Sequence, residues 1–247
     1  MSQTETTAVI ADGDGDLLGR PYTLDGFKWF SSATDSDLAL ALARTGPPSL
    51  GSRSLSLFLV PLRQPLGSSP NDSNSRSNNV YVHRLKDKIG TKILPTAELS
   101  LDGAQGFLIG PVNGGVKTIT SVLNITRLYC AIDSIGCLRR GFAIARSYAL
   151  VRTIQGGKQL LCDNPIHTAE LAKISLVYRG LTQLFFGTAV LLGRVECNVA
   201  TEDEQARLRL LTPTVKAFCA ELSVGALEEC MAALGGLGYM EETGMGR

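Results

Sequence analysis

Apolar and polar residues alternate in short runs over the first 112 residues, with turn-forming residues between the runs. The clearest runs are 22–24, 28–32, 38–42, 55–60, 80–84 and 97–101. A period of two is typical of strands that bury one face, and this spacing predicts a small β-barrel or sandwich. We expect turns at Asp12–Gly15 and Leu24–Phe27, where Asp and Gly stand together. The polar, low-complexity stretch Ser68–Asn79 predicts a disordered loop between strands, with no function.

From about Gly115 the apolar period becomes helical. The pattern predicts helices at Gly115–Arg152, Thr168–Glu196 and Asp203–Leu234, with a kink or a division expected at Pro213. Three long antiparallel helices with short connections indicate a helical bundle, one that lacks a partner helix. The predicted fold class is therefore α+β, with a middle β-barrel or sandwich domain over 1–112 and a C-terminal helical bundle over 113–247.

Composition narrows the class of protein. The chain has 247 residues, 44% of them hydrophobic and 19% charged, with a formal net charge of +1, so no overall field favours nucleic acid or an anionic membrane. The N-terminus has neither the basic nor the apolar region of a signal peptide, and the most apolar stretch, Leu184–Leu192, is shorter than a membrane span. We expect a soluble intracellular protein; cytoplasm, mitochondrion and peroxisome are not distinguished.

Cysteine and histidine contents bear on redox state and metals. All six cysteines lie in the second half and none forms a Cys-x-x-Cys motif, which favours buried free thiols over disulfides. Only two histidines are present, so no metal site is expected.

Three local motifs each allow two interpretations. The cluster Leu234–Tyr239 fits a helix C-cap and tight turn, or close approach of the backbone to a phosphate. The sole tryptophan, Trp29, fits a core strand, or an aromatic platform with neighbouring hydroxyls for a flat heterocycle. Arg152–Gly157 fits a helix C-cap, or a phosphate contact.

The order of the motifs, spread over nearly the whole chain, resembles the acyl-CoA dehydrogenase family. The matching segments are Gly26–Ser31 (G-x-K-W-x-[ST]), Lys88–Leu99, Gly110–Gly115, an Arg pair 25 residues apart (Arg127 and Arg152) and Leu234–Tyr239. Segments 84–90 and 238–242 are most similar to the alkylation-response (AidB-type) subgroup of that family.

The resemblance implies FAD as cofactor, an acyl-CoA thioester as substrate and a homo-oligomer, either a dimer or a tetramer. It further implies that Trp29 packs on the flavin and that Ser31 meets the N5 edge of the flavin. Arg152 and the backbone at Gly235, Gly236 and Gly238 would reach the FAD pyrophosphate of a neighbouring subunit. Arg127 would line the substrate end of the pocket.

The chain also departs from the family pattern. The flavin-cradling loop upstream of the β-domain and the N-terminal helices that would report acyl chain length are absent, Gln155 replaces a Phe, and Ala232 stands where Gln or Glu is frequent. Of the family's two positions for the catalytic base, one holds Thr126 and the other lies past Arg247; Glu241 and Glu242 come too early. We therefore expect no catalytic base and no oxidation of acyl-CoA by this chain alone.

The same departures leave alternatives open. The chain is a truncated or degenerate acyl-CoA dehydrogenase-like oxidoreductase, or a non-catalytic flavoprotein that associates with DNA or serves as a scaffold. Nucleic acid is not favoured, because the net charge is only +1.

Overall fold

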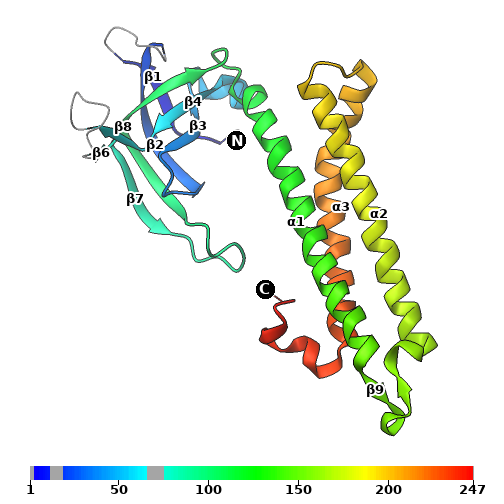
Figure 1. The fold of residues 1–247 in the computed structure, drawn as a ribbon. Coiled ribbons are helices and arrows are strands. Elements are labelled where there is room, and N and C mark those ends of the chain that lie inside the picture. The colour runs from blue at the N-terminus through cyan, green and yellow to red at the C-terminus, as the bar shows by residue number, and fades with distance from the viewer. Residues whose placement is uncertain (1–2, 12–18, 66–74, 247) are drawn as a thin grey trace. The chain divides into compact units, whose positions relative to one another are not determined.

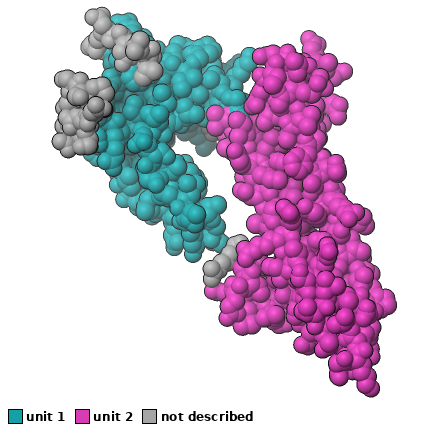
Figure 2. Space-filling view, viewed as in Figure 1, with its two compact units in different colours: residues 1–121 teal, residues 122–247 magenta. Residues whose placement is uncertain are grey.

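A computed structural model describes residues 3–11, 19–65 and 75–246. The chain divides into two compact units, Met1–Ser121 and Val122–Arg247, which Figure 2 colours separately. Each has its own apolar core, and the fold is α+β as predicted from the change of period.

The first unit is a small barrel. Its main sheet has the order β2-β1-β3-β4-β8-β7, and β2 also pairs with β8, so five strands close into a ring (Figure 1). β7 pairs with the first half of β8, on the same edge of β8 as β4. The strands are β1 (Thr7–Ile10), β2 (Pro21–Ser32), β3 (Leu38–Arg44), β4 (Leu55–Pro61), β7 (Val80–Leu85) and β8 (Thr96–Ile109). A separate hairpin pairs β5 (Arg63–Pro65) with β6 (Ser75–Ser77). The short helix η1 (Pro48–Ser54) joins β3 to β4.

The turn predicted at Leu24–Phe27 is wrong. These residues lie inside β2, where the register with β8 shifts between Leu24 and Asp25. Gly26 has a φ of +131°, and a Cβ there would lie 2.8 Å from the Cα of Thr6. Asp-Gly here forms a bulge that lets the N-terminal segment pass close to β2, so no chain reversal occurs. The turn predicted at Asp12–Gly15 lies outside the described residues.

The loop predicted at Ser68–Asn79 is wrong for Ser75–Ser77, whereas Asn78 and Asn79 do connect two strands; 68–74 lie outside the described residues. Ser75–Ser77 forms β6, and Asn78 is buried. The Asn78 amide nitrogen donates to the carbonyls of Pro61 and Gln105, both at 2.7 Å, and its oxygen accepts from Gln64 at 2.6 Å. One polar residue of this stretch, Asn78, thus anchors the segment between β6 and β7 to the barrel.

The second unit is a bundle of three long helices: α1 (Gly115–Val151, from Val122 onward), α2 (Pro165–Glu196) and α3 (Glu202–Ala233). The predicted helix ends agree with the observed ones to within three residues, and α3 runs unbroken through Pro213. Apolar side chains from all three helices form the core, among them Ala131, Leu181 and Val215. Between α1 and α2 lie the short strands β9 (Thr153–Ile154) and β10 (Gln159–Leu160), with η2 (Gln155–Gly157) and η3 (Leu161–Asp163).

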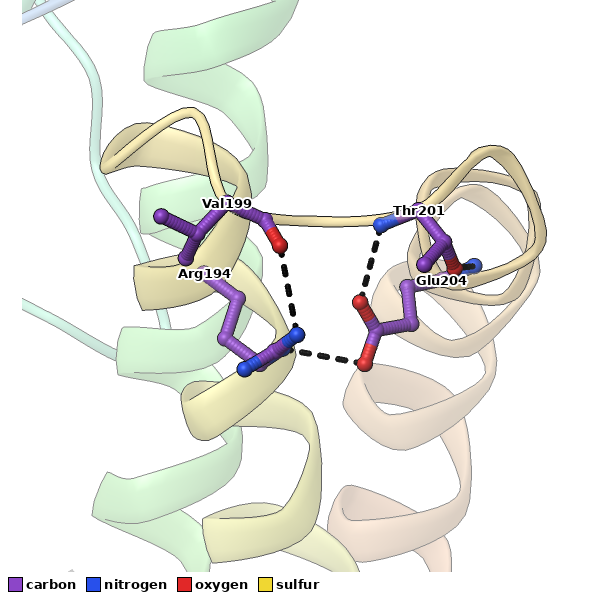
Figure 3. Close-up of polar contacts among 4 residues, drawn as sticks. All are labelled: Arg194, Val199, Thr201 and Glu204. Atoms are coloured by element: carbon purple, nitrogen blue, oxygen red, sulfur yellow. Dashed lines mark hydrogen bonds and ion pairs between the residues drawn. The ribbon is translucent and has the colours of Figure 1, made fainter.

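Polar contacts fix the connection between α2 and α3 (Figure 3). Glu204 accepts from the backbone N–H of Thr201 at 2.9 Å, and the Thr201 hydroxyl accepts from the N–H of Glu204 at 3.2 Å, which is a capping box. The Nε of Arg194 donates to Glu204 at 2.9 Å, and its Nη2 donates to the Val199 carbonyl at 3.2 Å. The backbone N–H of Thr201 and then Arg194 lower the pKa of Glu204. These contacts set where α3 begins and bind the end of α2 to it.

By length and composition, α2 and α3 could each cross a membrane. Core helices of soluble bundles meet the same criterion, and both helices contribute residues to the core of the second unit.

Candidate functional site

Trp29 stands near the C-terminal end of β2 and is 61% exposed, which excludes a buried core indole. It lines a hollow of about 470 Å³ in the first unit together with Ser31, two residues further along β2. Leu40, Leu42 and Val60 contribute apolar wall to the same hollow, and Ser32 and Thr34 add hydroxyl-bearing residues. An aromatic ring with hydroxyls at the edge of an apolar hollow suits a flat, partly polar ring system.

Lys28 was not singled out from the sequence, yet it lines the same hollow. Its ammonium donates to the carbonyl of Leu42, and burial lowers the pKa of Lys28 to about 8. The available signal was a lysine directly before the only tryptophan, within the G-x-K-W-x-[ST] segment.

A buried carboxylate organises the adjacent strands. Glu98 on β8 is only 7% exposed and accepts from Arg84 Nε at 2.7 Å and from the ammonium of Lys86. The hydrogen bond from Lys86 lowers the pKa of Glu98, with a smaller contribution from Arg84. Lys86 also lies over Trp29, its Nζ 3.0 Å from the ring centroid. The Lys86–Glu98 ion pair could not be predicted from the sequence, where the two residues are twelve positions apart. The pair forms only because of the register of β7 against β8.

The loop between β7 and β8 is held by a second lysine. Lys88 Nζ donates to Thr91 Oγ1, to the Leu94 carbonyl and to Thr96 Oγ1, at 3.1, 2.8 and 3.0 Å. The Thr96 hydroxyl in turn lies 3.3 Å from that of Ser32 at the end of β2. The Lys88–Leu99 motif therefore ties the loop to the strand that carries Trp29.

The barrel should lose stability as pH falls, and Glu98 should account for part of that loss. The folded-state pKa of Glu98 lies below its ordinary value of 4.5, so its contribution is complete above that pH and disappears as pH falls through the lowered pKa. Urea unfolding followed by Trp29 fluorescence should show a gap between wild type and Glu98→Gln at pH 7 that narrows toward pH 3. Glu204→Gln, in the other unit, is the matched control and should leave the Trp29 transition unmoved. A gap of constant size across this pH range would contradict the assignment.

Arg127, on α1, and Arg152, the residue after the end of α1, stand far apart. A separation of 25 residues along a helix corresponds to about 38 Å, so Arg127 and Arg152 of one chain cannot contact the same small group. Arg127 donates to Asn124 Oδ1 at 3.1 Å, and the neighbouring Thr126 hydroxyl donates to the Leu123 carbonyl at 3.0 Å. Any ligand that both arginines serve must therefore be long, or must be shared between chains.

Arg152 follows the end of α1 and is exposed, with its backbone N–H bonded to the Tyr148 carbonyl at 2.9 Å. The next residues include three successive positive φ values, +54° at Gln155, +69° at Gly156 and +88° at Gly157. Because α1 ends at Val151 and residues 155–157 form the turn between β9 and β10, the helix C-cap interpretation of these glycines is wrong, while Arg152 is exposed. A charged side chain in that position is available to an anion.

The glycine cluster after α3 lies at the same end of the bundle. Leu234 is the C-cap residue of α3, and Gly235, which follows it, has a φ of +63°, the left-handed region that glycine commonly supplies just past a helix end. Gly238 is buried, and a Cβ there would lie 1.9 Å from the Met231 carbonyl oxygen, whereas Gly236 has open space around its Cβ position. Val151, the residue before Arg152, lines one hollow with Leu234 and Leu237. The fold thus brings the Arg152 and glycine motifs together. The end of α3 accounts for Gly235, and the close approach to Met231 accounts for Gly238.

The cysteines are free, as predicted, but most are not buried. Cys219 and Cys230 are buried, and burial raises the pKa of both thiols, that of Cys230 to about 11. Cys130 and Cys137, on α1, and Cys197, the C-cap residue of α2, are exposed, so the prediction of burial is wrong for these three. Over the described ranges no three His, Cys, Asp or Glu side chains gather into a metal-binding group.

The chain thus has a barrel with an exposed Trp29 and a helical bundle with Arg152 and the glycine cluster at one end. Comparison with known protein families identifies both units. The profile "Acyl-CoA dehydrogenase, middle domain" matches residues 1–104, and "Acyl-CoA dehydrogenase, C-terminal domain" matches residues 113–247. The chain belongs to the acyl-CoA dehydrogenase family.

Among curated relatives, the chain is 42% identical over 245 residues to "Acyl-CoA dehydrogenase family member 11" of Caenorhabditis elegans, covering 98% of this chain and 37% of the relative. It is 32% identical over 247 residues to "Putative acyl-CoA dehydrogenase AidB" of Escherichia coli (strain K12), covering 100% of this chain and 41% of the relative. The chain therefore spans about two fifths of the length of these relatives.

Comparison with solved structures gives matches over nearly the whole chain. Caenorhabditis elegans ACDH-11 in complex with C11-CoA superposes with a TM-score of 0.83 at 40% identity, covering 98% of this chain and 39% of that one. The structure "Bd2924 apo-form" gives a TM-score of 0.86 at 41% identity, covering 100% and 47%. A non-catalytic, DNA-associated protein is not favoured by these similarities.

Proposed function

We propose that this chain supplies the flavin-binding barrel and part of the bundle of an FAD-dependent enzyme that dehydrogenates an acyl-CoA thioester between Cα and Cβ. The observation that carries the proposal is the match of both units to the two domains of one family, over nearly the whole chain. The relative solved with C11-CoA supports an acyl-CoA ligand. FAD, when bound, would supply the hydride acceptor.

The residues present fit that cofactor. Trp29 offers an exposed indole for stacking on the flavin ring, and the Ser31 hydroxyl lies on the same strand for its N5 edge. At the end of the bundle, the exposed guanidinium of Arg152 and the backbone near Gly235, Gly236 and Gly238 would hold the pyrophosphate. Arg127 would line the substrate end.

The length of α1 favours a homo-oligomer, a dimer or tetramer. Because Arg127 and Arg152 are separated by about 38 Å of helix, the substrate and pyrophosphate groups they serve belong to different sites of one assembly. We infer that Arg152 of one chain serves the FAD held against Trp29 of another. By analogy with its relatives, the assembly is a soluble intracellular enzyme.

FAD binding is the first test. Trp29 is the only tryptophan, so FAD that stacks on it should quench the intrinsic fluorescence, with weak affinity. Arg152→Ala should weaken binding by about 5–150-fold, equivalent to about 1–3 kcal/mol for a lost charge-assisted hydrogen bond. Arg179→Ala, which removes an exposed arginine from α2, is the control and should bind as wild type does. No quenching by FAD in the wild type, or equal affinities in both variants, would count against the assigned site.

The substrate side needs a second measurement. Addition of a medium-chain acyl-CoA to the FAD-loaded chain should shift the visible flavin spectrum without bleaching it, because the Thr126 hydroxyl cannot take a proton from Cα at neutral pH. Thr126→Glu places a carboxylate there and should raise the bleaching rate only slightly. An unchanged spectrum would reject the acyl-CoA ligand; bleaching by the wild type would show that another residue of the chain acts as base.

A further inference from the structure

The indole of Trp29 is exposed, yet one of its faces is occupied. Lys86 reaches across from the end of β7, with its Nζ 3.0 Å from the ring centroid. The Lys86 side chain is only 13% exposed, so the ammonium is largely removed from water. Cation–π attraction is stronger for a desolvated ammonium than for one at an open surface.

The ammonium is itself held in place. Glu98 on β8 accepts from Lys86 and, at 2.7 Å, from the Nε of Arg84. Glu98 is buried and lies in the paired region of the sheet, where Arg84 is its register partner. Glu98 therefore holds Lys86, and Lys86 in turn contacts the indole of Trp29. These two contacts link the exposed indole to a buried residue of the sheet.

We propose that Lys86 is a positioning residue for Trp29, covering one face of the indole and leaving the opposite face to stack on the flavin. This inference rests on the proposed function for the identity of the stacked ligand. Without Lys86 the indole would gain rotational freedom, and binding would have to restrict that freedom again at a cost in affinity. Lys86 acts through Trp29 and need not touch the flavin.

Lys86→Met tests this role, because it keeps much of the aliphatic length and removes the charge. Lys86→Arg should preserve the contact, since a guanidinium also stacks on an indole. Lys92→Met, at an exposed lysine of the same loop, removes the same charge and serves as control. The double variant Lys86→Met/Glu98→Gln avoids a buried carboxylate that has lost one of its cations, in case the single variant does not fold.

Two readouts separate the contact from its consequence. In ligand-free protein, acrylamide quenching reports solvent access to Trp29, and fluorescence anisotropy reports its mobility. Lys86→Met should increase the quenching and lower the anisotropy. Lys86→Arg and Lys92→Met should match wild type in both measurements. FAD affinity, measured independently by flavin fluorescence polarisation, should fall by about 2–5-fold in Lys86→Met and recover in Lys86→Arg.

The outcomes are distinguishable. Unchanged quenching and anisotropy in both Lys86→Met and the double variant would overturn the contact. Altered Trp29 mobility with unchanged FAD affinity would overturn the positioning role. Absence of FAD binding by the wild type would reject the proposed function and with it the flavin role of Lys86, while the two tryptophan readouts would still judge the contact alone.

Discussion

Gly238→Ala should lower the free energy of unfolding of the helical unit by about 3 kcal/mol, the upper part of the usual range for overpacking. The added Cβ would lie 1.9 Å from the carbonyl oxygen of Met231 in the last turn of α3. That atom belongs to the backbone, so relief requires moving the helix end or the following turn. Urea unfolding followed by far-UV circular dichroism measures the loss.

The neighbouring glycines supply matched controls. Gly236→Ala meets open space and should stay within about 0.5 kcal/mol of wild type. Gly235→Ala places an alanine at a φ of +63° and should cost about 1–2 kcal/mol through backbone strain. Equal stabilities for the Gly236 and Gly238 variants would contradict the close approach to Met231. The stabilities of these three variants are measured without FAD. They therefore report only the structural need for glycine at each position and not the proposed pyrophosphate contact.

Periodicity was sufficient to predict the three long helices and the strands β2, β3, β4, β7 and β8, because burial of one face leaves a repeating pattern in the sequence. It did not predict β1 or the short strands β5, β6, β9 and β10. It failed at Leu24–Phe27, where Asp-Gly is typical of turns. The evidence for a bulge there lies in the approach of Thr6, some twenty residues away in sequence. It failed again at Asn78, whose polar character matched its neighbours but whose hydrogen bonds go to Pro61, Gln64 and Gln105. Both errors concern tertiary contacts that composition does not record.

Some residues of the candidate site could be predicted from the sequence, and others could not. Resemblance and motif order pointed to Trp29 and Ser31, and both line one hollow. Three helices in alternating directions were enough to place the Arg152 and glycine motifs at one end of a bundle. Lys86 and Glu98 could not be found in this way, because a one-residue change in the register of β7 against β8 would separate them.

Phe58→Ala should be the most destabilising substitution in the barrel. Phe58 is 0% exposed and packs with its ring centroid 5.0 Å from that of Tyr22, within the core of the first unit. Truncation of a buried phenylalanine typically costs about 3–5 kcal/mol, because apolar contacts are lost and a cavity remains. Phe30→Ala, at a phenylalanine that is 58% exposed on β2, is the control and should change stability by less than about 1 kcal/mol.

The two cores share no residue, so the effect of Phe58→Ala should be confined to one unit. Trp29 fluorescence reports the barrel, since β2 carries the only tryptophan, while circular dichroism in the helical band reports mainly α1, α2 and α3. In Phe58→Ala the fluorescence transition should move to lower urea concentration, and the dichroism transition should keep its midpoint. Phe58→Leu, with a smaller cavity, should shift the fluorescence midpoint in the same direction but less. If both transitions moved together in both variants, the barrel and the bundle would unfold as a single cooperative unit, and separate cores would not imply separate stabilities.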